Sequence, residues 1–296
     1  MSWTSKAASF SAGIAVALLA LNPLSLPTPS LSVPHLDSLA SIPYVSSIPY
    51  LDSFFPPSTD APANATFECK PQPYTTQIVS TDPLVLYVHD FLSQAEIAAL
   101  LAAGSDLFKP SLTTKHGRSA PDTARTSWSA GLPLTEPAVQ CVLERAEGFM
   151  GTMMARGRDE MGAPQLVRYA EGQKFDLHYD WYPSFQRAAG ARKRRWNRPA
   201  SFFAVLEDGC EGGETWFPNV TAVEEQRGEG RFPWRRHEEG GIAFSPVAGN
   251  ALFWVNLFAN GTGDERTRHA GLPVTGGMKT AMNIWPKQYV GEDAWE

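Results

Sequence analysis

The sequence predicts a mostly β domain of the sandwich or jelly-roll class, with helices flanking it. From residue 164 onward, short runs of β-branched and aromatic residues alternate with Gly, Pro, Asn and Asp. This pattern is typical of short strands joined by turns. It differs from the alternating strand and helix patterns of α/β folds. The clearest runs are residues 201–206, 215–217, 251–255 and 280–285.

The first element in chain order is an apolar N-terminal segment. Residues 7–21 carry no charge and follow Lys6. They are short for a membrane span, which needs about 20 residues, but extension to Leu26 brings the segment into range. A cleaved signal peptide and a type II membrane anchor both fit. We expect residues 1–26 to be retained as an anchor, because no small-residue cleavage site is clear.

Residues 27–81 are predicted to form a stalk. Much of this segment is rich in Pro and Ser, and it contains the tandem sequences Ser41-Ile-Pro-Tyr44 and Ser47-Ile-Pro-Tyr50. Repeated proline favours an extended, semi-rigid backbone with few buried apolar contacts. The stalk would hold the following domain away from a membrane, although the two apolar repeats could instead lie against the domain surface.

The folded domain is expected at residues 82–296, with a helical part to about residue 160 and a β core at about 164–288. Ser93 and Glu96 form a capping-box pattern that predicts a helix over 93–107. Pro137 and a 3.6-residue apolar period predict a second helix over 136–156, which should end at Gly157.

Length and charge limit the class of protein. A chain of 296 residues can bury one sizeable core. Its net charge of −6 argues against a nucleic-acid groove, and the short basic run at 192–195 reads as a solvated loop. The polar segments 184–197 and 222–241 are expected to be surface loops.

Several features indicate the secretory pathway. The sequons begin at Asn64, Asn219 and Asn260, so we expect a glycoprotein. The three cysteines allow one disulfide with one thiol left over, and we assign them no catalytic role. The expected location is the lumen of the endoplasmic reticulum, with secretion as the alternative.

A metal-binding pattern lies in the segment that begins the β core. In an extended chain, side chains two positions apart share a face, so His178 and Asp180 can reach a common point. Together with His269 they would form a 2-His-1-carboxylate triad, which leaves one side of an iron ion open. His237 is a rival ligand, but it lies in a charged run that is more simply a solvated loop.

Five motifs occur in an order that resembles one enzyme family. They are Tyr169 with Gly-Gln-Lys-Phe-x-x-His178-Tyr-Asp180, Glu211-Gly-Gly-Glu-Thr-Trp-Phe-Pro218, Gly249-Asn-Ala-Leu-Phe-Trp254, His269-Ala-Gly-x-Pro-Val, and Lys279. Across residues 84–288 the chain resembles the catalytic domain of the prolyl 4-hydroxylase family of iron(II)/2-oxoglutarate dioxygenases. This resemblance refines the expected fold to a double-stranded β-helix.

The resemblance also implies roles for individual residues. His178, Asp180 and His269 would bind Fe(II) and form the catalytic centre. The far carboxylate of 2-oxoglutarate would be held by Lys279. Tyr169, Thr215 and Trp285 would complete the co-substrate pocket, and Arg198 would meet the peptide substrate. The implied cofactors are Fe(II), 2-oxoglutarate, O2 and ascorbate.

The implied function is hydroxylation of prolyl residues, with decarboxylation of 2-oxoglutarate to succinate. The partner would be a peptidyl-proline substrate. One alternative is a tailoring oxygenase that acts on a small molecule or cyclic peptide with the same iron site. Another is a catalytically silent module that binds Pro-rich peptides. The chain departs from the family pattern at Phe175, where Tyr is commoner, which bears on the substrate rather than on the iron ligands.

Overall fold

The computed structural model describes residues 67–115, 118–120, 122–188, 194–223, 233–292 and 294–295. The predicted anchor, the Pro-rich repeats and the sequon at Asn64 therefore lie outside the described residues. No helix in the described part of the chain is both long enough and apolar enough to cross a bilayer.

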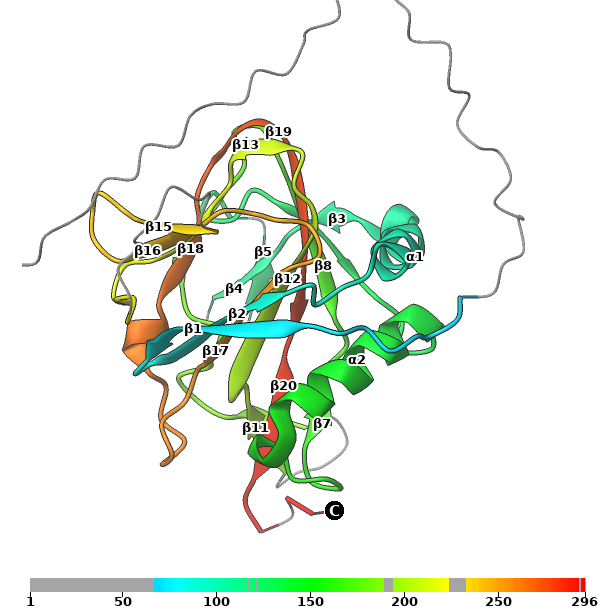
Figure 1. The fold of residues 1–296 in the computed structure, drawn as a ribbon. Coiled ribbons are helices and arrows are strands. Elements are labelled where there is room, and N and C mark those ends of the chain that lie inside the picture. Colours follow the sequence, from blue (N-terminus) through cyan, green and yellow to red (C-terminus); the bar gives the residue numbers. More distant parts are fainter. Residues whose placement is uncertain are drawn as a thin grey trace, which may run out of the picture. The chain divides into compact units, whose positions relative to one another are not determined.

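A large antiparallel sheet forms the centre of the domain (Figure 1). Its strands follow one another across the sheet in the order β1 (Thr75–Thr81), β2 (Leu84–His89), β17 (Ala251–Val255), β12 (Ala200–Glu207), β19 (Val274–Ile284), β8 (Gln165–Ala170), β6 (Trp128–Gly131) and β3 (Lys109–Pro110). A further strand, β13 (Cys210–Gly212), pairs with β19 outside this path.

A second sheet is antiparallel throughout its pairs and carries part of the predicted metal site. Its order is β15 (Trp234–Arg236), β16 (Ile242–Phe244), β14 (Thr215–Phe217), β18 (His269–Gly271) and β9 (Phe175–His178). Two smaller sheets complete the described strands. One contains β10 (Gln186–Arg187), β11 (Arg195–Asn197), β20 (Pro286–Val290) and β7 (Glu160–Met161), and the other contains β4 (Thr113–Lys115) and β5 (Arg118–Ala120).

The two predicted helices are present and lie on the same side of the large sheet (Figure 1). Helix α1 (Gln94–Gly104) begins with the expected capping box at Ser93 and Glu96, and the short helix η1 (Ser105–Leu107) continues it. Helix α2 (Pro137–Met150) ends earlier than predicted. Gly151 has φ of 52°, a conformation that terminates a helix, and η2 (Gly151–Met153) follows. A third short helix, η3 (Glu265–Thr267), precedes β18.

Two hydrophobic cores hold these layers together. One lies between the helices and the large sheet, where Leu100 and Val142 meet Phe202 and Phe253. The other lies between the two main sheets. Strand β12 serves both cores, which explains why seven of its eight residues are buried. The predicted mostly β fold with flanking helices is confirmed.

The folded part begins before residue 82, so the boundary predicted from the sequence is wrong. Strand β1 begins at Thr75, inside the predicted stalk, and pairs with β2 at the edge of the large sheet. A disulfide between Cys69 and Cys141 ties the preceding segment to α2. The strand was missed because most of its side chains are exposed, so it lacks a clear apolar alternation.

The two segments predicted as loops also contain strands. Strands β10 and β11 form a hairpin that pairs with β20, and β15 pairs with β16. Trp234 explains the second case. Its indole is buried against Tyr87 and Phe244, so this part of a charged segment is anchored in the core between the sheets. Residues 189–193 and 224–232 of these segments lie outside the described residues.

Candidate active site

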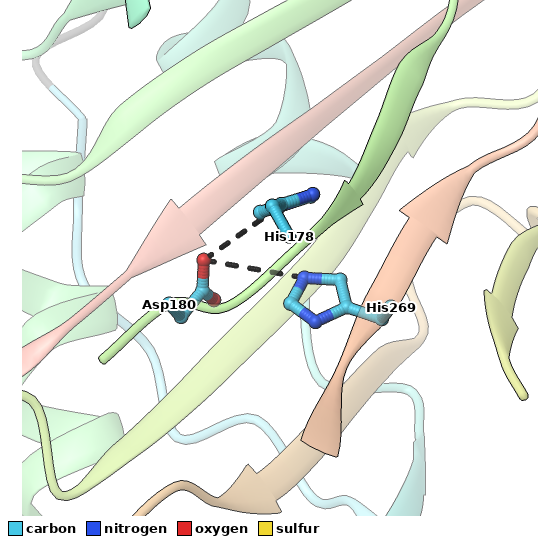
Figure 2. A group of neighbouring side chains, drawn as sticks. All are labelled: His178, Asp180 and His269. Carbon is cyan, nitrogen blue, oxygen red and sulfur yellow. Dashed lines mark ion pairs between the residues drawn. The ribbon is translucent and has the colours of Figure 1, made fainter. Parts of the chain in front are cut away.

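The structure brings His178, Asp180 and His269 together on neighbouring strands. His178 is the last residue of β9, Asp180 follows two positions later, and His269 opens β18. The two histidines are direct partners across the antiparallel β9–β18 pair. Oδ1 of Asp180 lies 3.9 Å from Nε2 of His178 and 4.0 Å from Nε2 of His269 (Figure 2).

Hydrogen bonds and ring contacts fix both imidazoles. Nδ1 of His178 lies 2.8 Å from the carbonyl oxygen of Asp176, and Nδ1 of His269 lies 3.0 Å from that of Thr267. A carbonyl oxygen only accepts, so each Nδ1 carries the proton and each Nε2 is left with a free lone pair. Phe175 stacks on His178 with ring centroids 3.6 Å apart, and Phe217 stacks on His269 at 5.1 Å.

The charge states of the three groups suit a metal ion. Burial and the neighbouring His269 lower the pKa of His178 to about 3. Burial opposes ionisation of Asp180, but His269, His178 and Arg198 outweigh it and lower its pKa to about 2. At neutral pH the site therefore presents a neutral His178 imidazole beside an ionised carboxylate. Nitrogen and carboxylate donors in this number are the set that Fe(II) takes in facial triads.

A cavity of about 440 Å³ opens beside this triad. Every residue that the sequence predicted for the site lines it. These residues are His178, Asp180, His269, Lys279, Tyr169, Thr215, Trp285 and Arg198. They come from both main sheets and from the segments that follow β9, β11 and β19. The cavity is large enough for a small-molecule ligand, since such sites are usually about 300–1,000 Å³.

Lys279 is a buried cation in the cavity wall. Its side chain is 2% exposed, and its Nζ donates to the carbonyl oxygen of Gly213 at 2.7 Å and to Oγ1 of Thr215 at 3.5 Å. Burial lowers its pKa to about 8. No carboxylate among the described residues forms an ion pair with it. An ammonium has three donors, so Lys279 can accept an anionic partner from a ligand.

The Tyr169 ring and the Thr215 hydroxyl lie beside this ammonium. Tyr169 is the partner of Lys279 across the β8–β19 pair, and the ammonium lies 5.9 Å from the centre of its ring. Burial raises the pKa of Tyr169, so the phenol keeps its proton and remains a donor. Thr215 opens β14 and is buried beside Lys279.

Trp285 and Arg198 meet on the Asp180 side of the cavity. The guanidinium of Arg198 lies 3.7 Å from the centre of a Trp285 ring, and its Nη1 donates to the backbone carbonyl of Asp180 at 3.2 Å. The Trp285 indole N–H donates to Oδ2 of Asp180 at 3.0 Å. Trp285 thus contacts a predicted metal ligand, whereas the family resemblance placed it at the co-substrate.

Arg125 is a cavity residue that sequence reasoning missed. Its guanidinium lies 4.7 Å from the centre of the Phe175 ring, and its Nη2 donates to Oε1 of Gln165 at 3.1 Å. The residue lies in an irregular segment between β5 and β6, without a periodic pattern. The one available signal was an arginine among small polar residues, which does not by itself predict a site.

His237, the rival ligand, lies elsewhere. Its ring packs on Trp216 with centroids 4.5 Å apart, and its Nδ1 accepts a hydrogen bond from the backbone of Glu239. Among the residues that the structure describes, His178, Asp180 and His269 form the one group of three or more His, Cys, Asp or Glu suited to hold a metal.

Comparison with known proteins finds a family match over the β core. Residues 164–287 match the 2OG-Fe(II) oxygenase superfamily. The prolyl 4-hydroxylase subunit alpha-1 of Rattus norvegicus is 30% identical over 210 residues, which are 69% of this chain and 34% of the rat subunit. Prolyl 4-hydroxylase 1 of Arabidopsis thaliana is 28% identical over 219 residues, or 72% of this chain and 71% of the plant protein.

A solved structure is also similar. The viral collagen prolyl hydroxylase of Paramecium Bursaria Chlorella virus-1, in its 2OG complex, covers 69% of this chain with 21% identity and a TM-score of 0.49, over 96% of the viral chain. The present chain spans about a third of the length of the rat subunit.

Residues 164–287 form a domain that matches the 2OG-Fe(II) oxygenase superfamily, and the curated proteins similar to the chain include prolyl 4-hydroxylases. This match agrees with the class that the sequence motifs predicted, an oxidoreductase of the dioxygenase type. Enzymes of this superfamily use Fe(II), 2-oxoglutarate and O2.

Proposed function

We propose that this protein hydroxylates prolyl residues in peptides or proteins and converts 2-oxoglutarate to succinate. The observation that carries the proposal is the shared cavity of the His178, Asp180 and His269 cluster and the buried Lys279 ammonium. A metal triad alone fits many reactions. A buried cation without an ion-pair partner among the described residues, in the same cavity, fits a co-substrate that carries a second carboxylate.

The residues of the cavity fit iron and 2-oxoglutarate. His178, Asp180 and His269 would hold Fe(II) through two imidazole nitrogens and one carboxylate oxygen. Lys279 would pair with the far carboxylate of 2-oxoglutarate, and Tyr169 and Thr215 would donate hydrogen bonds to it. When bound, iron and 2-oxoglutarate supply the activation of O2.

The chain's own groups then position the reactants. Tyr169, Thr215 and Lys279 are buried, so water has little access to the co-substrate end of the cavity. Arg198 and Arg125 present cationic donors near Asp180, where a peptide carbonyl can accept a hydrogen bond. The guanidinium of Arg198 lines the cavity, and its Nη1 is fixed by the backbone carbonyl of Asp180 at 3.2 Å.

The choice of a prolyl substrate is supported by the relatives. Those with similarity over most of their length, such as the Arabidopsis protein, are prolyl 4-hydroxylases. The aromatic side chains of Trp285 and Tyr182 line the cavity beside Arg198, and flat apolar surfaces suit the rigid ring of proline. A tailoring oxygenase for small molecules would use the same iron site, so the substrate needs a direct test.

A location in the secretory pathway belongs to the same proposal. Cys69 and Cys141 form a disulfide, and such bonds persist mainly in oxidising compartments. The sequon residues Asn219 and Asn260 are both exposed, which suits glycosylation. We place the protein in the lumen of the endoplasmic reticulum, with residues 1–26 as a membrane anchor and ascorbate as the reductant.

The test is product analysis with a defined peptide. Purified protein is incubated with Fe(II), 2-oxoglutarate, ascorbate and poly-proline or collagen-like peptides. Mass spectrometry should show a gain of one oxygen on proline, matched by succinate release. Asp180→Ala should remove both products. Succinate release that no proline-containing peptide stimulates would instead favour a small-molecule oxygenase, and absence of succinate with every substrate would favour a silent binding module.

A further inference from the structure

The two oxygens of Asp180 have different surroundings. Oδ1 faces Nε2 of both histidines (Figure 2). Oδ2 points the other way and accepts two hydrogen bonds, one from the hydroxyl of Ser201 at 2.7 Å and one from the indole N–H of Trp285 at 3.0 Å. The carboxylate is therefore held so that one oxygen is occupied and the other is presented to the metal position.

A third residue determines where the Ser201 hydrogen points. Nδ2 of Asn256 donates to Oγ of Ser201 at 2.9 Å. A serine hydroxyl has a single hydrogen. Because Asn256 fills an acceptor position on Oγ, that hydrogen remains available for Asp180. The opposite amide orientation would require Ser201 to donate to two oxygens, which it cannot do.

The backbone fixes this hydrogen-bonded chain of Asn256, Ser201 and Asp180. The N–H of Asn256 donates to the carbonyl of Pro199 at 2.8 Å, and its carbonyl accepts from the N–H of Asp264 at 2.8 Å. Ser201 and Asn256 are both 0% exposed, so water does not compete for these bonds. Ser201 belongs to β12, which pairs with β17 immediately before Asn256.

We infer that Ser201, oriented by Asn256, and Trp285 are positioning residues that restrict Asp180 to ligation through a single oxygen. The inference rests on the proposed binding of Fe(II) by Asp180. A carboxylate free to rotate can bind a metal through both oxygens. Doing so would occupy a coordination position that the facial triad must leave open. The two histidines are restrained in the same manner, since each has its second nitrogen held by a backbone carbonyl.

A positioning role for Ser201 and Trp285 differs from a purely structural one. Hydrogen bonds to a buried carboxylate satisfy it in any protein, and their loss then changes stability alone. A positioning role also changes the metal. Loss of an outer partner of a metal ligand typically lowers metal affinity by about 10- to 100-fold.

The experiment measures Fe(II) binding without turnover. Wild type, Ser201→Ala and Trp285→Phe are titrated anaerobically with Fe(II) against a chelator, and the visible charge-transfer absorption is recorded after 2-oxoglutarate is added. Ser80→Ala and Trp216→Phe are matched controls. Ser80 is also a buried serine, and the Trp216 indole donates to the Gly240 carbonyl rather than to a site residue. The melting temperature of each metal-free variant checks folding.

We expect each site variant to bind Fe(II) about 10-fold more weakly or worse, with an altered charge-transfer band. Ser201→Thr, which keeps the hydroxyl, should stay closer to wild type than Ser201→Ala. Both controls should bind like wild type. Folded Ser201→Ala and Trp285→Phe with wild-type affinity and spectrum would overturn the inference. If Ser201→Ala fails to fold, Trp285→Phe decides. Wild type that binds no Fe(II) would instead refute the proposed function.

Discussion

The ammonium of Lys279 donates to the backbone carbonyl of Gly213 at 2.7 Å, on a cavity wall where its side chain is 2% exposed. Gly213 lies just before β14, and Lys279 lies in the middle of β19, so the bond joins the connection between the sheets to the large sheet. This neutral carbonyl and the more distant Thr215 hydroxyl, at 3.5 Å, do not compensate the burial of a full charge. The buried Lys279 charge therefore lowers the folding stability of the ligand-free protein, and a bound carboxylate would offset that loss.

This relationship predicts opposite effects of Lys279→Met on binding and on stability. The fall in the Lys279 pKa from 10.5 to about 8 means that burial of the charged side chain costs the folded state about 3 kcal/mol at neutral pH. Lys279→Met removes this cost. The Gly213 carbonyl loses its partner, at about 1–3 kcal/mol. We expect a ligand-free protein as stable as wild type or up to about 2 kcal/mol more stable, with no detectable binding of 2-oxoglutarate.

Denaturant unfolding and calorimetric titration with 2-oxoglutarate measure these two effects. The matched control is Lys287→Met, because Lys287 pairs with Glu160 at 2.8 Å outside the cavity. That variant should bind 2-oxoglutarate normally. A Lys279→Met protein that binds 2-oxoglutarate like wild type would contradict the assigned anchor.

The same pKa predicts a pH dependence. Lys279 has a lower pKa in the folded protein than the ordinary 10.5, so between about pH 8 and 10.5 the unfolded chain binds more protons at this position. Stability attributable to this group therefore rises with pH across that interval. The affinity for 2-oxoglutarate should fall above pH 8, because the neutral amine attracts a carboxylate less strongly.

Other groups titrate in this range, so the difference between wild type and Lys279→Met is the quantity to measure. Unfolding free energies at pH 7 and at the highest pH where both proteins remain native give the change. The unfolding free energy of the wild type should rise relative to that of Lys279→Met as pH increases. An equal response of the two proteins would show that Lys279 does not titrate with a lowered pKa.

The sequence predicted those parts of the site that depend on local spacing. His178 and Asp180 lie two residues apart beside a strand, so period-two geometry already places them on one face. Lys279 and His269 were found because both occur in motifs near one another in the chain. The capping box likewise predicted the start of α1, because the signal lies within four residues.

The parts that were missed depend on pairing between distant segments. Ser201 gains its role only because β12 places it opposite β17, next to Asn256, and because Asp180 reaches the same point. Arg125 approaches the cavity through an isolated bridge to Phe175, fifty residues later in the chain. Neither contact leaves a periodic signal in sequence. Strand β1 was missed for a related reason, since its partner at the sheet edge stabilises residues that are individually polar.

The disulfide between Cys69 and Cys141 should contribute measurably to stability. It closes a sequence separation of 72 residues and fastens the segment before β1 to α2. A cross-link of this length restricts the unfolded chain, and removal of such a bond typically costs about 2–5 kcal/mol. We expect Cys69→Ser to lower the free energy of unfolding by that amount without loss of the β-rich fold.

Cys210→Ser is the control, because the Cys210 thiol is unpaired. Its stability should stay within about 0.5 kcal/mol of wild type. Denaturant unfolding of both variants, and of wild type with and without reductant, gives the comparison. A free-thiol assay shows whether the reductant has opened the disulfide. If it has, and the unfolding curve of the wild type is unchanged, the predicted contribution is wrong.

Two glycines should respond to alanine in opposite directions. Gly241 precedes β16 with φ of 73°, and a Cβ there would overlap the carbonyl oxygen of Phe217. Because Phe217 stacks on His269, the required shift would also disturb the metal position. Gly148 lies on the exposed side of α2, and a Cβ there meets nothing within 4 Å. We expect Gly241→Ala to lose about 2 kcal/mol or more and Gly148→Ala to gain about 0.5–1 kcal/mol.

Thermal unfolding of the two variants beside wild type separates backbone strain from a general effect of added volume. Gly241→Ala should also bind Fe(II) more weakly, because displacement of Phe217 releases one face of the His269 ring. Gly148→Ala should bind Fe(II) like wild type, since α2 lies across the large sheet from the cavity. A Gly241→Ala protein with wild-type stability would contradict the prediction, because the turn before β16 would then accommodate a side chain beside Phe217.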